Sequence, residues 1–266
     1  MKHALYMAPF AELAEPAAMV EVAQAAEAAG WDGLFLWDHV LREPEEVSEI
    51  ADVWITLAAM AAATERIRLG PMVTPASRRR IAPLVRQTTT LDRLSGGRLT
   101  MGLGLGVDSG GELSRFGEVV DERTRAAILD ESAEVLAAAW AGEHVVHRGA
   151  HVTVDGVTFA PRPLQQPRIP MWFAARGRAL RPVRRAARYD GLFLIEAEVA
   201  DLERALDEVR TVRGGSLDGF DTAVSVSPVD DAALLEVPGV TWAMHSMAPV
   251  EPLADILELT TAGPPA

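Results

Sequence analysis

One short stretch of the sequence places two side chains that can exchange protons directly after an apolar segment. Residues 32–39 read Asp-Gly-Leu-Phe-Leu-Trp-Asp-His, and the run before Asp38 and His39 is typical of a parallel strand buried on both faces. Imidazole has a pKa of about 6.5, and a neighbouring carboxylate can orient it or favour its charged form. We therefore predict a proton-transfer role for His39, with Asp38 as its partner. In the alternative interpretation, Asp38 caps the following segment and His39 is a polar rim residue.

The same apolar pentapeptide occurs a second time with different residues after it. Residues 190–194 again read Asp-Gly-Leu-Phe-Leu, but Ile-Glu-Ala follows where the first copy has Trp-Asp-His. We expect two strands with similar packing demands, and an internal duplication is the alternative. The repeat keeps the strand and changes the residues after it, which indicates that the chemistry belongs to the segment after the strand.

A glycine-rich segment, Gly-Leu-Gly-Leu-Gly at 102–106, ends another apolar run. It is not a dinucleotide-binding fingerprint, because Ser109 stands where the third glycine of that motif would fall. Without a Cβ, Gly104 and Gly106 would let the backbone approach a flat ring or an anion closely. The alternative is close packing of a strand on a helix.

A basic turn follows the apolar segment 169–175. Arg176, Gly177 and Arg178 lie just before an expected helix over 179–188, and a glycine turn leading into free helix N–H groups can hold a phosphate. The alternative is a solvated arginine face. Three histidines, His144, His147 and His151, have spacings seen in metal sites on helices. Here, however, the neighbouring valines and glycines favour extended structure, and we expect surface histidines.

Apolar strand-like runs alternate with helical ones along the whole chain, about eight times. The expected strands include 3–7, 67–74, 98–106, 169–175, 222–227 and 240–246, and the expected helices include 16–30, 51–64, 82–94, 122–142, 200–214 and 252–263. This pattern predicts one α/β domain over residues 1–266, a (β/α)8 TIM barrel with a short excursion at about 144–168. A doubly wound sheet is the competing fold. In such a barrel the catalytic residues follow the carboxyl ends of the strands, which is where Asp38, His39 and the glycine segment fall.

Composition narrows the range of partners and chemistries. The formal net charge is −13, from 38 acidic against 25 basic residues, which disfavours binding to nucleic acid. The chain has no cysteine, so thiolate catalysis and disulfides are excluded, and redox chemistry requires a bound cofactor. We find neither a signal peptide nor a segment of ~20 apolar residues, and expect a cytoplasmic protein that does not enter a membrane.

Taken in order, several segments resemble the bacterial luciferase-like flavin and deazaflavin oxidoreductases. These segments are AEAAGWDGLFLWDH, ERIRLGPMVTP, TLDRLSGGRLTMGLGLG, PLQQPRIPMWFAA and RRAARYDGLFL. The resemblance covers nearly the whole chain, and its most specific part is the LDRLSGGRL segment with the glycines after it. It implies a TIM barrel that binds F420, or FMN as the alternative, across the barrel mouth.

The resemblance also implies roles for individual residues. Gly104, Leu105 and Gly106 resemble the backbone that lines the cofactor, and Pro71 and Met72 resemble a bulge with a non-proline cis peptide behind the ring. Gly177, Arg178, Ala179 and Leu180, with Arg176, resemble the loop that binds its phosphate. The Asp38–His39 pair resembles that of F420-dependent members, in which the histidine works beside the site of hydride transfer.

Two departures from the family pattern matter for function. In F420-dependent sugar dehydrogenases, a glutamate directly follows the glycines that correspond to Gly104 and Gly106. Here Val107 and Asp108 follow them. The chain is also shorter than usual, which implies an open mouth or one completed by a second subunit, and we expect a homodimer. We therefore expect hydride transfer to or from a small organic substrate. The alternatives are an FMN-dependent monooxygenase, a non-catalytic flavin-binding relative and, least favoured, a metal-dependent hydrolase.

Overall fold

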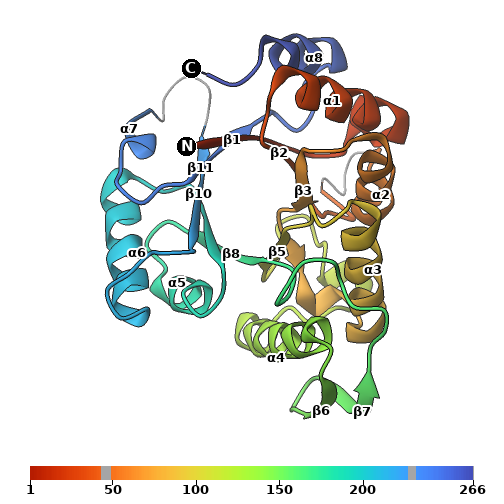
Figure 1. Ribbon diagram of the computed structural model, residues 1–266, viewed down its shortest axis with the longest axis vertical. Helices are drawn as coiled ribbons and strands as arrows, with labels where there is room; N and C mark the ends of the chain where they lie inside the picture. The colour runs from red at the N-terminus through yellow and green to blue at the C-terminus, as the bar shows by residue number, and fades with distance from the viewer. Residues whose placement is uncertain (43–48, 227–231, 266) are drawn as a thin grey trace.

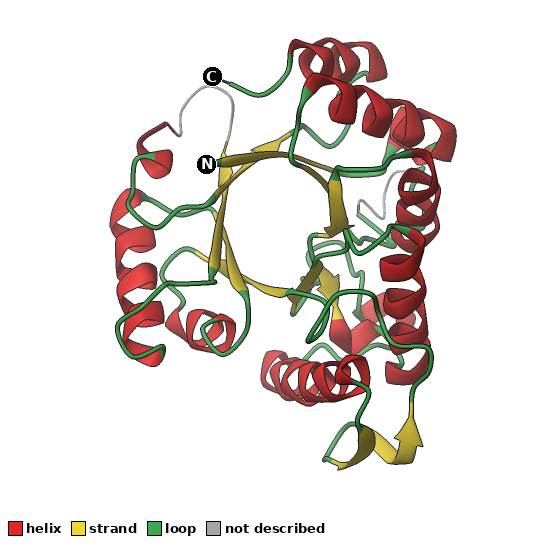
Figure 2. Cartoon of the chain, in the orientation of Figure 1, coloured by secondary structure: helices red, strands yellow, loops and turns green. Residues whose placement is uncertain are grey.

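Eight strand positions form a parallel ring in the computed structural model, which describes residues 1–42, 49–226 and 232–265 (Figures 1 and 2). The strands are β1 (Lys2–Met7), β2 (Gly33–Leu36), β3 (Arg68–Pro71), β4 (Thr74–Pro75), β5 (Met101–Gly104), β8 (Met171–Arg176), β9 (Gly191–Ile195), β10 (Asp221–Val226) and β11 (Trp242–Ser246). Their order in the sheet is β3-β2-β1-β11-β10-β9-β8-β5-β4, and β3 and β4 are two halves of one strand position.

The first strand pairs with the last, as a barrel requires. β1 and β11 are parallel neighbours, with Lys2 opposite Trp242 and Tyr6 opposite Ser246. On the other side β4 pairs with β5, and a bridge between Leu69 and Leu99 joins β3 to the approach to β5. The prediction of a TIM barrel is therefore confirmed, and the doubly wound alternative is wrong.

A helix follows each strand position and packs on the outside of the ring (Figure 2). The helices are α1 (Pro16–Ala29), α2 (Val53–Ala63), α3 (Ile81–Leu94), α4 (Glu122–Ala141), α5 (Leu180–Ala186), α6 (Val199–Val212), α7 (Ala232–Leu235) and α8 (Leu253–Ala262), with short 3-10 turns η1 (Ala11–Ala14), η2 (Ala76–Arg78) and η3 (Ser114–Phe116). Between α4 and β8 an antiparallel hairpin of β6 (His144–Arg148) and β7 (Thr153–Thr158) extends from the barrel (Figure 1). No helix of the described part of the chain is long and apolar enough to span a membrane.

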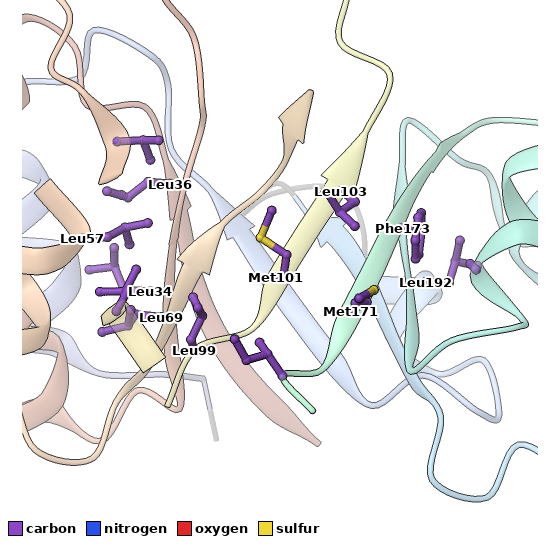
Figure 3. Close-up of a cluster of buried hydrophobic side chains, with 14 of the residues drawn as sticks. Leu34, Leu36, Leu57, Leu69, Leu99, Met101, Leu103, Met171, Phe173 and Leu192 are labelled. Atoms are coloured by element: carbon purple, nitrogen blue, oxygen red, sulfur yellow. The ribbon is translucent and has the colours of Figure 1, made fainter. Parts of the chain in front are cut away.

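Strand side chains alternate between two apolar clusters. On β2, Leu34 and Leu36 point outward and pack beneath the helices with Leu57 of α2, as Figure 3 shows. Phe35, between them, points into the barrel, where it meets Trp172 and Trp242 at ring distances of 5.6 and 6.1 Å. Aromatic rings thus fill the barrel centre, which is a packed core and not a channel.

The repeated pentapeptide has a packing explanation in the two copies. Phe193 of β9 points into the barrel as Phe35 does, and both glycines lie beneath large rings. A Cβ at Gly33 would crowd Phe35 and Trp242, and a Cβ at Gly191 would overlap Trp172. The two aspartates also act alike: Asp32 accepts a hydrogen bond from the His3 amide and Asp190 from the Met171 amide, each at 2.8 Å. Similar positions in the barrel therefore impose the same five residues.

The apolar helix α2 is mostly part of the core of the single chain. Its residues Val53, Trp54, Leu57, Met60 and Ala61 are buried. Ile55 stays 68% exposed, and with the half-buried Ala59 and the exposed Ala62 it forms a narrow stripe. Most of the apolar surface of α2 is therefore covered within the single chain.

A buried histidine pair between β1 and β11 predicts sensitivity to acid. His245 lies 3.0 Å from the His3 ring, and burial together with the His3 charge lowers the pKa of His245 to about 4. The unfolded chain therefore binds more protons here than the folded one once the pH falls below about 6.5, so this part of the stability is lost as the pH falls toward 4. We expect about 3 kcal/mol of unfolding free energy to depend on this protonation.

Urea unfolding at pH 7 and pH 4 measures this effect. His245→Gln, which cannot titrate, should lose less stability between the two pH values than the natural chain, while His151→Gln on the exposed hairpin serves as the matched control. Equal losses in all three proteins would show that the buried pair does not contribute.

Candidate functional site

The carboxyl ends of the parallel strands bring the predicted residues to one end of the barrel. Asp38 and His39 follow β2, Met72 and Val73 separate β3 from β4, and Gly104 ends β5. The peptide bond between Met72 and Val73 is cis. Arg176 ends β8, which is the neighbour of β5 in the sheet. This end of the barrel is called the mouth below.

His39 is held by a carboxylate that the sequence reading did not single out. Its Nδ1 lies 3.0 Å from Glu112 Oε2, and Glu112 Oε1 accepts a 2.6 Å hydrogen bond from the Val40 amide. Burial alone would raise the pKa of Glu112, but the bonds from His39 and Val40 and the charge of Arg78 outweigh it, so the pKa lies below its ordinary value. An ionised Glu112 makes Nδ1 the protonated nitrogen of neutral His39, so Nε2 is free to accept a proton.

Asp38 does not orient His39, and this part of the prediction is wrong. Its buried carboxylate accepts hydrogen bonds from Thr74 Oγ1 at 2.7 Å, from Arg79 at 2.7 and 2.9 Å, and from Arg78 at 3.1 Å. These donors lie on the segment after β3, so Asp38 joins the end of β2 to the next strand position. Among the described residues, its side-chain contacts are with the segment after β3 and not with residues 39–42.

Two arginines and two carboxylates form one buried network behind His39. Arg78, whose side chain is 5% exposed, donates to Glu112 at 2.5 Å and to both the backbone carbonyl and the carboxylate of Asp38. Arg79 completes the pairing of Asp38. The four charges balance, so a proton that arrives on His39 adds a positive charge beside Glu112.

The mouth glycines are required by strand packing. A Cβ on Gly104 would overlap the Val73 side chain, and one on Gly102 would overlap the Pro71 carbonyl. The alternative role expected for these glycines was close packing of a strand on a helix. The close contacts are instead with the neighbouring strand position, at Pro71 and Val73. The carbonyls of Leu105 and Gly106 accept hydrogen bonds from the buried Arg125 of α4 at 3.0 and 2.9 Å, which fixes the loop from behind.

Aromatic side chains surround His39. Trp37 lies 5.6 Å from the ring of Tyr6 and 6.3 Å from that of Phe10, and both Trp37 and Phe10 contact His39 at about 6 Å between ring centroids. The buried Trp37 Nε1 has no hydrogen-bond acceptor among the described residues. Trp37 and His39 are partly exposed, so their rings offer faces on which a flat ring system could stack.

The expected phosphate loop lies at the end of β8. Gly177 has a φ of +50°, and its amide donates to the Ile195 carbonyl at 3.1 Å. Arg176 and Arg178 are 59% and 77% exposed, while Ala179 and Leu180 lead into the short helix α5. The backbone amide of Ala179 donates to the Arg176 carbonyl, and the exposed guanidinium groups of Arg176 and Arg178 are available to an anion.

The hairpin histidines do not gather around one point. His144 contacts Thr158 at 3.2 Å, and His147 lies 3.7 Å from Glu131, whose carboxylate also accepts from the His151 amide. Nowhere in residues 1–42, 49–226 and 232–265 do three possible metal ligands cluster. A surface hollow of about 420 Å³ lies between α4, Arg168 and Tyr189, on the side where β8 and β9 begin.

Glu112, Arg78, Arg79 and Arg125 were missed as site residues. The arginine run 78–80 stands out in the sequence as a basic patch, but nothing in it indicates that two of its members are buried against carboxylates. Glu112 lies in a glycine-rich loop six residues after Gly106, and only the folded chain brings it to His39.

Comparison with known proteins gives a consistent result. Residues 4–233 match the family model described as luciferase-like monooxygenase. The F420-dependent glucose-6-phosphate dehydrogenase of Microbacterium testaceum is 28% identical over 230 residues, which cover 82% of this chain and 67% of that protein. The enzyme of the same name from Nakamurella multipartita is 29% identical over 170 residues, covering 64% of this chain and 49% of its own. The chain thus matches between about half and two thirds of the length of these relatives.

Among solved structures, monooxygenase RslO1 from Streptomyces bottropensis has the same fold. The TM-score is 0.80 with 18% identity, and the match covers 98% of this chain and 96% of that one.

Proposed function

Because the chain belongs to the luciferase-like monooxygenase family, we propose that it is an oxidoreductase that binds F420 at the mouth and acts on a small organic substrate. The observation that carries this proposal is the ordered His39–Glu112 pair beside the rings of Trp37 and Phe10 at the mouth. The names of the two relatives favour F420. FMN-dependent monooxygenation is the second candidate, favoured by the family description and by the name of the structural neighbour.

Within this proposal, His39 handles the proton while the bound ring accepts or donates the hydride. For oxidation of an alcohol, Nε2 takes the hydroxyl proton, and for reduction of a carbonyl it returns one. Glu112 holds the Nδ1 proton and stabilises the imidazolium, as a carboxylate does for a general base. Trp37, Tyr6 and Phe10 exclude water and orient the ring.

Gly104, Leu105 and Gly106 provide the backbone edge of the same pocket, and Pro71 and Met72 the surface beneath the ring. Arg125 supports this edge by holding two of its carbonyls. The cofactor phosphate binds the loop from Arg176 to Leu180, with Gly177 permitting the turn and the two arginines supplying charge.

Replacing Arg176 and Arg178 together by alanine should weaken F420 binding roughly 10- to 100-fold, because each exposed arginine contributes about the 0.5–1.5 kcal/mol net of an ordinary hydrogen bond. Equilibrium dialysis measures the affinity. Arg148→Ala is the matched control, since it removes another exposed arginine that pairs with an acid. Unchanged F420 affinity in the double variant would place the phosphate elsewhere.

The experiment that tests the proposed function as a whole is titration of the purified protein with F420 and, separately, with FMN. F420 binding followed by turnover with an alcohol or carbonyl compound supports the first candidate, and oxygen-dependent turnover with reduced FMN supports the second. Binding without either reaction would indicate a non-catalytic relative.

We also propose a homodimer and a cytoplasmic location. Support for the dimer comes from the exposed stripe of Ile55, Ala59 and Ala62 on α2, which a second copy would cover. Light scattering measures the mass in solution.

A further inference from the structure

Each arginine of the phosphate loop faces a carboxylate. Arg176 Nε lies 3.3 Å from Glu196 Oε2, and Arg178 Nε lies 3.6 Å from Asp201 Oδ1. We infer that Glu196 and Asp201 are specificity residues, which reduce the advantage that the arginines of the loop give to the doubly charged phosphomonoester of FMN over a singly charged phosphodiester such as that of F420. This inference rests on the proposed function, because it takes the loop to be the phosphate site.

The charge of the paired groups supports this role. Asp201 also accepts a hydrogen bond from Arg204 in the next turn of α6, so three guanidinium groups face two carboxylates and leave one net positive charge. A phosphomonoester carries about −1.5 to −2 at pH 7, whereas a phosphodiester carries one negative charge. Because the Coulomb energy scales with the product of the charges, each carboxylate repels the monoester about twice as strongly.

The two carboxylates are held beside the loop. Asp201 is only 9% exposed and lies in the first turn of α6, so its side chain cannot turn away from Arg178 without losing Arg204. Glu196 has a φ of +52°, a left-handed conformation that is unfavourable for a residue with a side chain. The Gly177 amide donates a hydrogen bond to the carbonyl of Ile195, the residue before Glu196. This bond joins the backbone at Glu196 to the loop.

The neighbouring tyrosine adds no charge to the site. Burial raises the pKa of the Tyr6 hydroxyl far above its ordinary value, with smaller opposing influences from Arg176 and Glu196. Tyr6 therefore stays neutral at every pH at which cofactor binding would be measured. The arginine–carboxylate pairs, and not Tyr6, therefore contribute charge around an incoming phosphate, and more distant exposed charges are screened by salt.

Three probes that share one ring isolate the effect of phosphate charge: riboflavin, riboflavin 4′,5′-cyclic phosphate and FMN. Riboflavin has no phosphate, the cyclic phosphate carries one negative charge, and FMN carries about two. We expect the two carboxylates to reduce the affinity of the natural chain for FMN more than its affinity for the cyclic phosphate. In the Glu196→Gln/Asp201→Asn variant, affinity should rise about tenfold for FMN, about threefold for the cyclic phosphate and not at all for riboflavin. Asp155→Asn, which breaks the ion pair on the hairpin, is the control and should change none of them.

Equal gains for FMN and the cyclic phosphate would overturn the specificity role while leaving the loop as the phosphate site. A gain with riboflavin would show that the carboxylates act on the ring, which also overturns it. F420 is titrated in parallel: if the natural chain binds neither F420 nor any of the three flavins, the proposed function fails, and this inference fails with it.

Discussion

His39→Ala should lower turnover by about 10²- to 10⁴-fold, the usual contribution of general acid–base catalysis, with little change in F420 affinity. The reason is geometric: Glu112 occupies Nδ1, which leaves Nε2 as the proton-accepting atom at the mouth. The phosphate loop and the aromatic surface do not depend on the imidazole for cofactor binding. Turnover is followed through the absorbance of F420 with any alcohol or carbonyl compound that the natural chain accepts.

His144→Ala is the matched control, since this histidine lies exposed on the β6–β7 hairpin and should leave turnover unchanged. The turnover of Glu112→Gln should lie between those of His39→Ala and His144→Ala. The amide oxygen can still accept a hydrogen bond from Nδ1, but it carries no charge to stabilise an imidazolium. Parallel losses of cofactor affinity and of stability in His39→Ala, with turnover per bound cofactor intact, would show that His39 only shapes the pocket.

The barrel and the position of His39 were predictable because both follow from local patterns. Apolar strand runs such as 190–194, alternating with helices, specify the fold, and a residue at the end of a strand must lie at the mouth. The repeated pentapeptide shows how strict this is, because Gly33 and Gly191 are both required by rings from other strands.

The partner of His39 was not predictable in this way. Glu112 lies in an irregular loop between β5 and α4, and its position depends on contacts far apart in the sequence. Gly110, two residues earlier, packs so closely on the Arg42 carbonyl that a Cβ would overlap it, and Val40 donates to Glu112. A periodic sequence pattern does not predict such contacts between residues far apart in the chain. Asp38, adjacent to His39 in sequence, was therefore the natural but incorrect choice.

The buried network behind His39 predicts a large loss of stability in Arg78→Met. Removing this guanidinium takes from Glu112 a buried charged donor, while the bonds from His39 and the Val40 amide remain, and it weakens the pairing of Asp38. Breaking a buried ion pair on one side costs about 3–5 kcal/mol, because the remaining charge stays buried. For a chain of this size that corresponds to a fall in melting temperature of roughly 10 °C, which calorimetry or thermal circular dichroism would detect.

Arg80→Met provides the matched comparison, since Arg80 is exposed at the start of α3 and makes no ion pair with the described residues. Its melting temperature should be nearly unchanged. Combining Arg78→Met with Glu112→Gln should destabilise the protein less than the sum of the two single changes, because the carboxylate that loses its partner is neutralised at the same time. Additive losses, or equal melting temperatures for Arg78→Met and Arg80→Met, would mean that the charges around Asp38 and Glu112 are solvated in solution. The orientation of His39 would then require another explanation.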